Sequence, residues 1–107
     1  KEKRITMITI TAEEVKARLD AGEAINLVDV REPAEHAEFN IGGKLVPLGK
    51  IQTMQTEDID DLKNEEVICY CRSGARSTQA SLMLETFGFT NVKNLAGGMM
   101  GWQEKYK

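Results

Sequence analysis

A short apolar run, a polar loop and a helical pattern follow one another between Val67 and Phe87. The run Val67–Tyr70 is apolar and β-branched, which is typical of a buried strand. From Ser77 to Phe87 the apolar residues recur at helical spacing. The loop between the two segments opens with Cys71 and holds one glycine and two arginines. A strand that passes through so short a loop into a helix favours an α/β fold, whose functional loops gather at the carboxyl ends of the strands.

Cys71 stands where free backbone amides and the positive end of the following helix dipole are expected to converge. Such a socket binds anions, and it would stabilise a thiolate, which is the nucleophilic form of cysteine. Lowering a thiol pKa of about 8.5 by about two units requires about 2.7 kcal/mol, which one or two charge-assisted hydrogen bonds and a helix terminus supply. We therefore expect Cys71 to be ionised and reachable without a histidine base; a side chain turned inward, away from any cavity, would contradict this.

The composition is that of one globular domain, because 107 residues suffice for a single core and the hydrophobic fraction, 41%, is ordinary. A formal net charge of -3 provides no basic field, so we expect neither nucleic acid nor a membrane as a partner. Two cysteines at C-x-C spacing and one histidine form neither a disulfide framework nor an ordinary zinc site. We expect no metal, no cofactor and a reducing, cytoplasmic location.

The chain begins at Lys1 rather than at a methionine. Met7 is one candidate for the natural start, in which case residues 1–6 are an added or flexible leader; the alternative is that further residues precede Lys1. In both cases we expect residues 1–107 to form a single domain, since the sequence contains no repeat, linker or low-complexity segment.

The remaining segments predict strands alternating with helices, which implies parallel pairing. Thr11 and Glu14 form a capping box that predicts a helix to about Asp20. The mostly apolar run Ala24–Val30 is typical of a central strand covered on both faces. The other expected elements are an edge strand over 5–10, helices over 34–39, within 50–62 and over 99–106, and short strands over 45–48 and 92–95. The residues expected in or near the core include Met54, Met83, Met99, Met100 and Trp102.

Polar residues near the loop each allow more than one interpretation. Arg72 and Arg76 are either solvated charges or ligands of an anion. Arg76, at the junction of loop and helix, is expected to bind an anion or to pair with a carboxylate, for which Asp29 at the end of another central strand is the natural candidate. Cys69 is expected in the core, with a resolving-thiol role as the minor alternative. His36 is expected on a helix surface and not in catalysis.

Four pieces of the sequence, in this order, resemble the single-domain rhodanese (thiosulfate sulfurtransferase-like) family. Each piece alone is a weak match, but together, at these separations, they are specific and span nearly the whole chain. The resemblance implies a rhodanese-like α/β fold with a parallel five-stranded sheet and helices on both faces. One departure is Asn40, where the family often carries a histidine in a segment one residue longer. The four pieces are Leu27–Glu32, Cys71–Ser77, Phe87–Val92 and Leu95–Trp102.

The resemblance also implies a transferase in which Cys71 takes a sulfane sulfur from a small anionic donor such as thiosulfate. The resulting persulfide passes the sulfur to cyanide, to a thiol or to a protein acceptor. The implied substrate-binding residues are Arg72, Ser73, Gly74, Ala75 and Arg76, and the supporting residues are Asp29 and Arg31.

Two other functions share this pattern of residues. A persulfide carrier or docking module would load sulfur for one protein partner and turn over poorly with small acceptors. A phosphatase or arsenate reductase would need five residues between its cysteine and arginine, so that the loop encircles a tetrahedral oxyanion. Here four residues separate Cys71 from Arg76. The shorter loop makes a smaller cradle, which favours a lone sulfur atom over a phosphoryl group.

Overall fold

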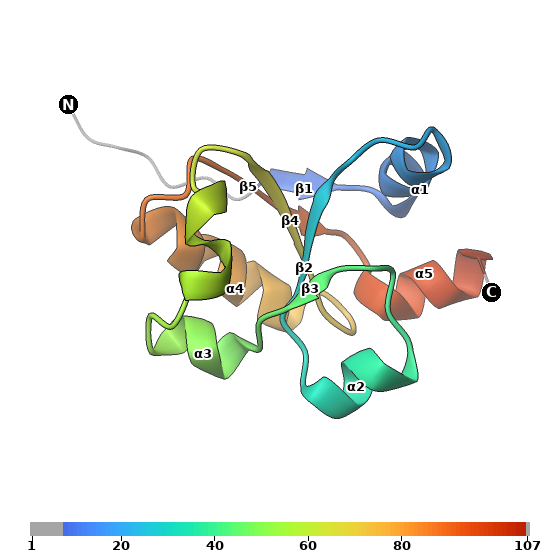
Figure 1. Cartoon of the computed structure of the whole chain (residues 1–107). Helices are drawn as coiled ribbons and strands as arrows, with labels where there is room; N and C mark the ends of the chain where they lie inside the picture. Colours follow the sequence, from blue (N-terminus) through green and yellow to red (C-terminus); the bar gives the residue numbers. More distant parts are fainter. Residues whose placement is uncertain (1–7, 107) are drawn as a thin grey trace.

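The computed structural model describes residues 8–106 of the chain (Figure 1). Five strands form one sheet in the order β1-β5-β4-β2-β3, and every neighbouring pair is parallel. The predicted parallel five-stranded sheet is therefore confirmed. The strands are β1 (Ile8–Ile10), β2 (Asn26–Asp29), β3 (Lys44–Leu45), β4 (Glu66–Tyr70) and β5 (Asn91–Leu95).

Helices cover both faces of the sheet, as predicted (Figure 1). One face packs against α1 (Ala12–Asp20) and α5 (Gly98–Tyr106). The opposite face packs against α3 (Leu48–Gln52), the 3-10 helix η1 (Glu57–Leu62) and α4 (Ala75–Thr86). The short helix α2 (Pro33–Glu38) follows β2 and contains no buried residue, so burial of apolar surface does not hold it in place.

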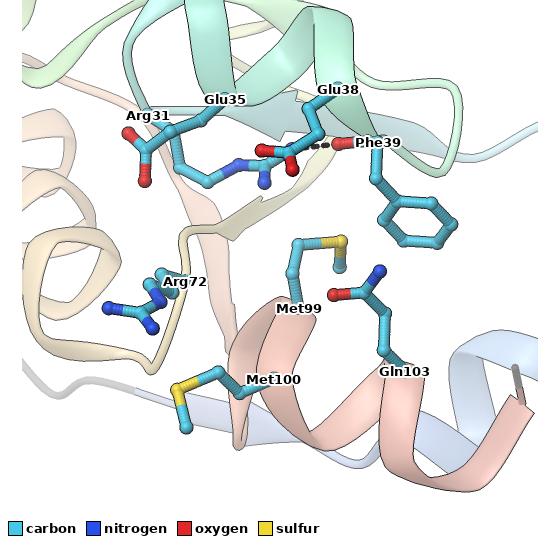
Figure 2. Close-up of a pocket in the computed structure, with 8 residues that line it drawn as sticks. All are labelled: Arg31, Glu35, Glu38, Phe39, Arg72, Met99, Met100 and Gln103. Atoms are coloured by element: carbon cyan, nitrogen blue, oxygen red, sulfur yellow. Dashed lines mark hydrogen bonds between the residues drawn. The ribbon is translucent and has the colours of Figure 1, made fainter.

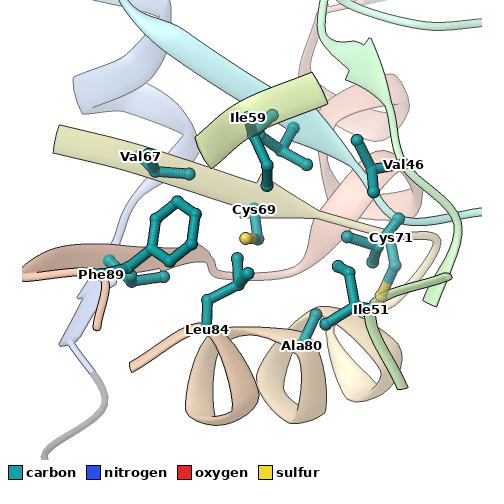
Figure 3. Packing of buried hydrophobic residues seen from close by; sticks show 12 residues of the cluster. Val46, Ile51, Ile59, Val67, Cys69, Cys71, Ala80, Leu84 and Phe89 are labelled. Carbon is teal, nitrogen blue, oxygen red and sulfur yellow. The ribbon is translucent and has the colours of Figure 1, made fainter. Parts of the chain in front are cut away.

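The alternation of side chains along β4 divides the core in two. Val67 and Cys69 point toward α4, and Cys71 continues that row beyond the end of the strand. Ile68 and Tyr70 point toward α1 and α5, where Trp102 is also buried. The first residue after β4 therefore lies on the α4 side of the sheet. Figure 3 shows Cys69 and Cys71 on this side, with Cys69 facing Ala80 and Leu84 of α4.

Local signals in the sequence set several boundaries correctly. The Glu14 amide donates to the Thr11 hydroxyl oxygen, and the Thr11 amide donates to the Glu14 carboxylate, so the capping box at the start of α1 is confirmed. The helix α4 starts at Ala75, two residues earlier than expected, because Gly74 turns the backbone directly into the helix at φ +115°. The predicted strand over 5–10 lies partly outside the described residues.

Two methionines contradict the expected core. Met54 is 67% exposed in the turn after α3, and Met100 is 45% exposed on α5. Met99, the neighbour of Met100, is only 2% exposed, because adjacent positions on a helix point in different directions. Among residues 8–106 no helix is both long and apolar enough to cross a membrane.

Candidate active site

The carboxyl ends of the neighbouring strands β2 and β4 bring two distant segments together. Asp29, the last residue of β2, lies opposite Tyr70, the last residue of β4. Cys71 and its loop therefore begin at the same edge of the sheet as Asp29 and Arg31. This juxtaposition agrees with the expectation that the polar residues after the two strands share one site.

Backbone amides converge on the sulfur of Cys71, as predicted. The amide of Gly74 donates to Sγ over 3.1 Å, and the amide of Ser77, in the first turn of α4, donates over 3.3 Å. These groups belong to the loop and to the helix start, where amides have no partner within the helix. The loop thus curls around the sulfur and points partial positive charge at it.

The pKa of Cys71 is lowered from its ordinary value even though burial of the thiol acts in the opposite direction. Hydrogen bonds from Ser77 and from the amides of Gly74 and Ser73 outweigh the burial. The Ser77 hydroxyl also lies within hydrogen-bond distance of the Gly74 carbonyl and the Asn94 side chain. Because a hydroxyl donates one hydrogen at a time, the amides are the constant part of this stabilisation.

The predicted accessibility of Cys71 is wrong for this conformation. Its side chain points toward α4, into the apolar cluster that contains Val46 and Ile51, and only 1% of the residue is exposed (Figure 3). The sulfur is thus turned inward, although the loop residues Arg72, Ser73 and Ala75 are exposed. The sequence could not reveal this cover, because Val46 and Ile51 belong to a distant segment.

The start of α5 is hydrogen-bonded to the backbone of the Cys71 loop. The amide of Met99 donates to the carbonyl of Cys71, and the amide of Met100 donates to the carbonyl of Arg72, each over 2.8 Å. This close approach requires a glycine at position 98, because a Cβ there would lie 2.5 Å from the Cys71 oxygen. Two backbone hydrogen bonds and one glycine therefore fix the loop to α5.

Arg76 pairs with Glu35 rather than with Asp29, so the predicted pairing is wrong. Both terminal nitrogens of the Arg76 guanidinium donate to the Glu35 carboxylate over 2.8 Å. This ion pair, together with a hydrogen bond from the Glu32 amide, lowers the pKa of Glu35 to about 2. Glu35 also accepts a hydrogen bond from the Glu32 amide in the capping box of α2, but that local pattern does not indicate a partner for Arg76.

Asp29 instead joins Arg31 and His36. Arg31 donates to both carboxylate oxygens of Asp29, over 2.9 and 2.8 Å, and His36 Nδ1 lies 2.8 Å from Asp29 Oδ2. Burial acts to raise the pKa of Asp29, but the bonds from Arg31 and His36 outweigh it and lower the pKa. His36 is therefore partly buried and bonded, not simply on a helix surface, and α2 is held by two polar contacts made from adjacent residues.

Cys69 and Asn94 complete the surroundings of the loop. Cys69 is fully buried, as expected, and burial raises its pKa to about 12. Asn94, which the sequence did not single out, is buried on β5 and bonds to Ser77 and Thr78 at the start of α4. A lone asparagine within a strand carries no local signal for such a role.

A cavity of about 530 Å³ adjoins the loop between α2 and α5, and we call it the α2–α5 cavity (Figure 2). Cys71 does not line it, but its neighbour Arg72 does. Figure 2 shows side chains from α2 above the cavity and from α5 below it. The lining residues are Arg31, Glu35, Glu38, Phe39, Arg72, Met99, Met100 and Gln103.

Comparison with known proteins decides the family. The model of the rhodanese-like domain matches residues 11–105. The chain belongs to the rhodanese-like domain family. A sulfurtransferase of Allochromatium vinosum is 40% identical to this rhodanese-like chain, over 87% of it and 85% of the relative. The crystal structure of a rhodanese-like domain protein from Staphylococcus aureus has a TM-score of 0.79 and 33% identity, covering 90% of this chain and 91% of that one.

Another relative shows that rhodanese-like chains also occur within larger proteins. The putative sulfur carrier protein YrkF of Bacillus subtilis is 34% identical over 90% of this chain. The chain spans about half of that relative's length, 51%. Membership of the family thus supports sulfur transfer in general, and the relatives include both a sulfurtransferase and a protein named as a putative sulfur carrier.

Proposed function

We propose that the protein is a sulfurtransferase that moves a sulfane sulfur from an anionic donor such as thiosulfate to a thiophilic acceptor through a persulfide on Cys71. The observation that carries this proposal is the pair of amides, from Gly74 and Ser77, directed at the Cys71 sulfur. They favour the thiolate, and they would equally stabilise the charge that returns to Sγ when the sulfur leaves.

In the first step the Cys71 thiolate attacks the outer sulfur of thiosulfate. The new Sγ–S bond forms as the S–S bond of the donor breaks, and sulfite leaves with the electron pair. In the second step an acceptor, cyanide or a thiolate, attacks the outer sulfur of the persulfide. The Sγ–S bond then breaks and its electron pair returns to Sγ, so the two steps are balanced without an added oxidant or reductant.

Arg72 and Arg76 favour an anionic donor at this edge of the sheet, although Glu35 already occupies the guanidinium of Arg76. Only 1% of Cys71 is exposed, and Val46 and Ile51 cover the sulfur on the α4 side of the sheet. In this proposal the exposed loop residues Arg72 and Ser73 move to admit donor and acceptor, while Gly74 keeps its amide on the sulfur. The loop is held on its α5 side by two hydrogen bonds, which a local opening can break.

Incubation with thiosulfate tests the first step. We expect mass spectrometry to show one added sulfur on Cys71, and Cys71→Ala to carry none and to lose transfer to cyanide. Cys69→Ala is the matched control, since it removes the neighbouring thiol. The proposal is wrong if Cys71→Ala transfers sulfur as fast as the unchanged protein.

The second candidate function is a persulfide carrier that serves one protein partner. The covered sulfur favours it, because a partner that opens the loop would give access that small acceptors lack. The resemblance to a putative sulfur carrier protein points the same way. Steady-state kinetics separates the two: high turnover with cyanide or a small thiol identifies an enzyme, and stoichiometric loading with poor turnover identifies a carrier.

A further inference from the structure

The charges around the α2–α5 cavity fall into two kinds. Arg31 and Glu35 face the cavity but are engaged, with Asp29 and Arg76 respectively. Glu38 and Arg72 also line it, and within residues 8–106 neither has an ion-pair partner. A ligand can therefore bind these two exposed side chains without breaking an existing ion pair.

The lining carries no net charge, because its two arginines are balanced by its two glutamates. A small dianion such as thiosulfate would be attracted by Arg72 and repelled by Glu38. A zwitterion suits the cavity better, with a carboxylate near Arg72 on the loop side and an ammonium group near Glu38 on the α2 side. Figure 2 shows these two residues on different sides of the cavity. The cavity as a whole is thus not built for the donor.

The remaining wall is apolar and contains sulfur. Phe39, Met99 and Met100 line it, and thioethers are soft, polarisable groups that pack well against methylene and sulfur atoms. A volume of about 530 Å³ accommodates a small organic molecule and far exceeds what cyanide needs.

The cavity is linked to the loop on two sides. On the α5 side, Met99 and Met100 donate their amides to the carbonyls of Cys71 and Arg72. On the α2 side, Glu35 binds Arg76. A molecule in the cavity therefore lies against groups that hold the loop, beside the residue that follows Cys71.

We propose that the α2–α5 cavity binds the sulfur acceptor and selects thiols that carry both an ammonium group and a carboxylate, with Glu38 and Arg72 as the specificity-determining residues. The proposal rests on the sulfurtransferase function proposed above. Once the loop has opened, the acceptor thiolate attacks the outer sulfur of the protonated persulfide. The acceptor's S–S bond forms, the Sγ–S bond breaks, and the products are the acceptor hydropersulfide and the Cys71 thiolate.

Four small thiols test this selection in single-turnover reactions of the persulfide-loaded protein. L-cysteine carries both charges, cysteamine only the ammonium group, 3-mercaptopropionate only the carboxylate, and 2-mercaptoethanol neither. The measured quantity is the thiol concentration that gives half the maximal rate of sulfur loss, by mass spectrometry. Comparing each thiol between variants cancels its intrinsic reactivity. The variants are Glu38→Gln, Glu38→Lys and Arg72→Gln, and Glu57→Lys is the control because it makes the same charge change outside the cavity.

We expect Glu38→Gln to raise the half-saturating concentration of L-cysteine and cysteamine by up to about fivefold, the size of one exposed charge pair. Glu38→Lys should raise it further for cysteamine and lower it for 3-mercaptopropionate. Arg72→Gln should raise the half-saturating concentration of the two thiols that carry a carboxylate, L-cysteine and 3-mercaptopropionate. For 2-mercaptoethanol, which carries neither charge, we expect no change in Glu38→Gln or Glu38→Lys.

If Glu38→Lys and Glu57→Lys respond alike to all four thiols, the cavity does not recognise the ammonium group and the proposal is wrong. Loading with thiosulfate is measured separately before each reaction. Failure to load would overturn the sulfurtransferase function itself, so the two failures are distinguishable.

Discussion

Cys71 combines a covered side chain with a lowered pKa, and Cys69 shows how unusual this is. Both residues belong to the same apolar cluster and both are buried. Burial raises the pKa of Cys69 to about 12, whereas Cys71 shifts in the opposite direction. The amides of Gly74 and Ser77 donate hydrogen bonds to the sulfur of Cys71 and not to that of Cys69. Position at the end of a strand, rather than burial, therefore decides which thiol can ionise.

We expect alkylation of Cys71 by iodoacetamide to follow a pH profile whose midpoint lies below that of a free thiol, because hydrogen bonds from Ser77 and the loop amides lower the pKa of Cys71. The rate is expected to be slow at every pH because the loop must open first. Measuring the reaction in Cys69→Ser isolates the Cys71 profile. A midpoint above that of a free thiol would show that burial outweighs the amides.

At the scale of the element, α5 is both a core helix and the clamp of the loop. Gly98 has φ +56°, and a Cβ on it would meet the carbonyls of Cys71 and Arg72 at 2.5 and 2.6 Å. We expect Gly98→Ala to lower the free energy of unfolding by more than the roughly 1–2 kcal/mol that left-handed backbone costs an L-residue. Urea denaturation measures this change.

Gly101 is the matched control in the same helix. A Cβ at this position has no atom within 4 Å, and its φ is not in the left-handed region. Gly101→Ala should therefore raise the free energy of unfolding, by up to about 1 kcal/mol, through higher helix propensity. Equal effects of the two substitutions would contradict the assigned role of Gly98.

The helix α2 depends on polar contacts, because none of its residues is buried. We expect a double-mutant cycle of Glu35→Ala and Arg76→Ala to give a coupling free energy of about 0.5–1 kcal/mol, since both side chains are partly exposed. The same cycle with Glu38→Ala should give none, as Glu38 does not contact Arg76. Urea denaturation gives the free energy of unfolding of each single and double variant. Equal coupling free energies in the two cycles would refute the pairing of Glu35 with Arg76.

Elements that a local signal defines were predicted well, whereas contacts between elements were not. The Thr11 capping box and the glycine of the loop act within a few residues, so the start of α1 and the convergence of amides on Cys71 followed from the sequence. The partner of Arg76 lies 41 residues away in sequence. Two carboxylates, those of Asp29 and Glu35, follow from β2 at the same end of the sheet as the Cys71 loop, so either was a possible partner. Choosing between them required the orientation of α2, which no local pattern specifies.

At the scale of the whole molecule, Glu66 ties three elements together at the start of β4. Arg18 of α1 and Lys93 of β5 both bind its carboxylate. The pKa of Glu66 is lowered to about 2, and the hydrogen bond from Arg18 is the largest cause. Partial burial acts in the opposite direction. The start of β4 is thus joined by charge to α1 and to β5, at the end of the sheet opposite the loop.

A carboxylate with a lowered pKa stabilises the folded state above its unfolded pKa, 4.5, and loses this effect as the pH falls toward 2. We expect Glu66→Gln to lower the free energy of unfolding at pH 7 and to reduce its dependence on pH between 4.5 and 2. Glu57→Gln serves as the control, because none of the ion pairs within residues 8–106 includes Glu57. Unfolding curves at several pH values measure this dependence. If the free energy of unfolding varies with pH in the same way in both variants, the role assigned to Glu66 is contradicted.

The cover over the Cys71 sulfur also bears on how the resting protein ages. Peroxide and dissolved oxygen attack exposed thiolates first and carry them toward sulfinic and sulfonic acids, which cannot be reversed by ordinary reductants. A sulfur that is 1% exposed meets such oxidants only while the loop is open. The cover over Cys71 is therefore expected to slow oxidation of the resting thiol, and the opening that admits a substrate also sets the rate of irreversible damage.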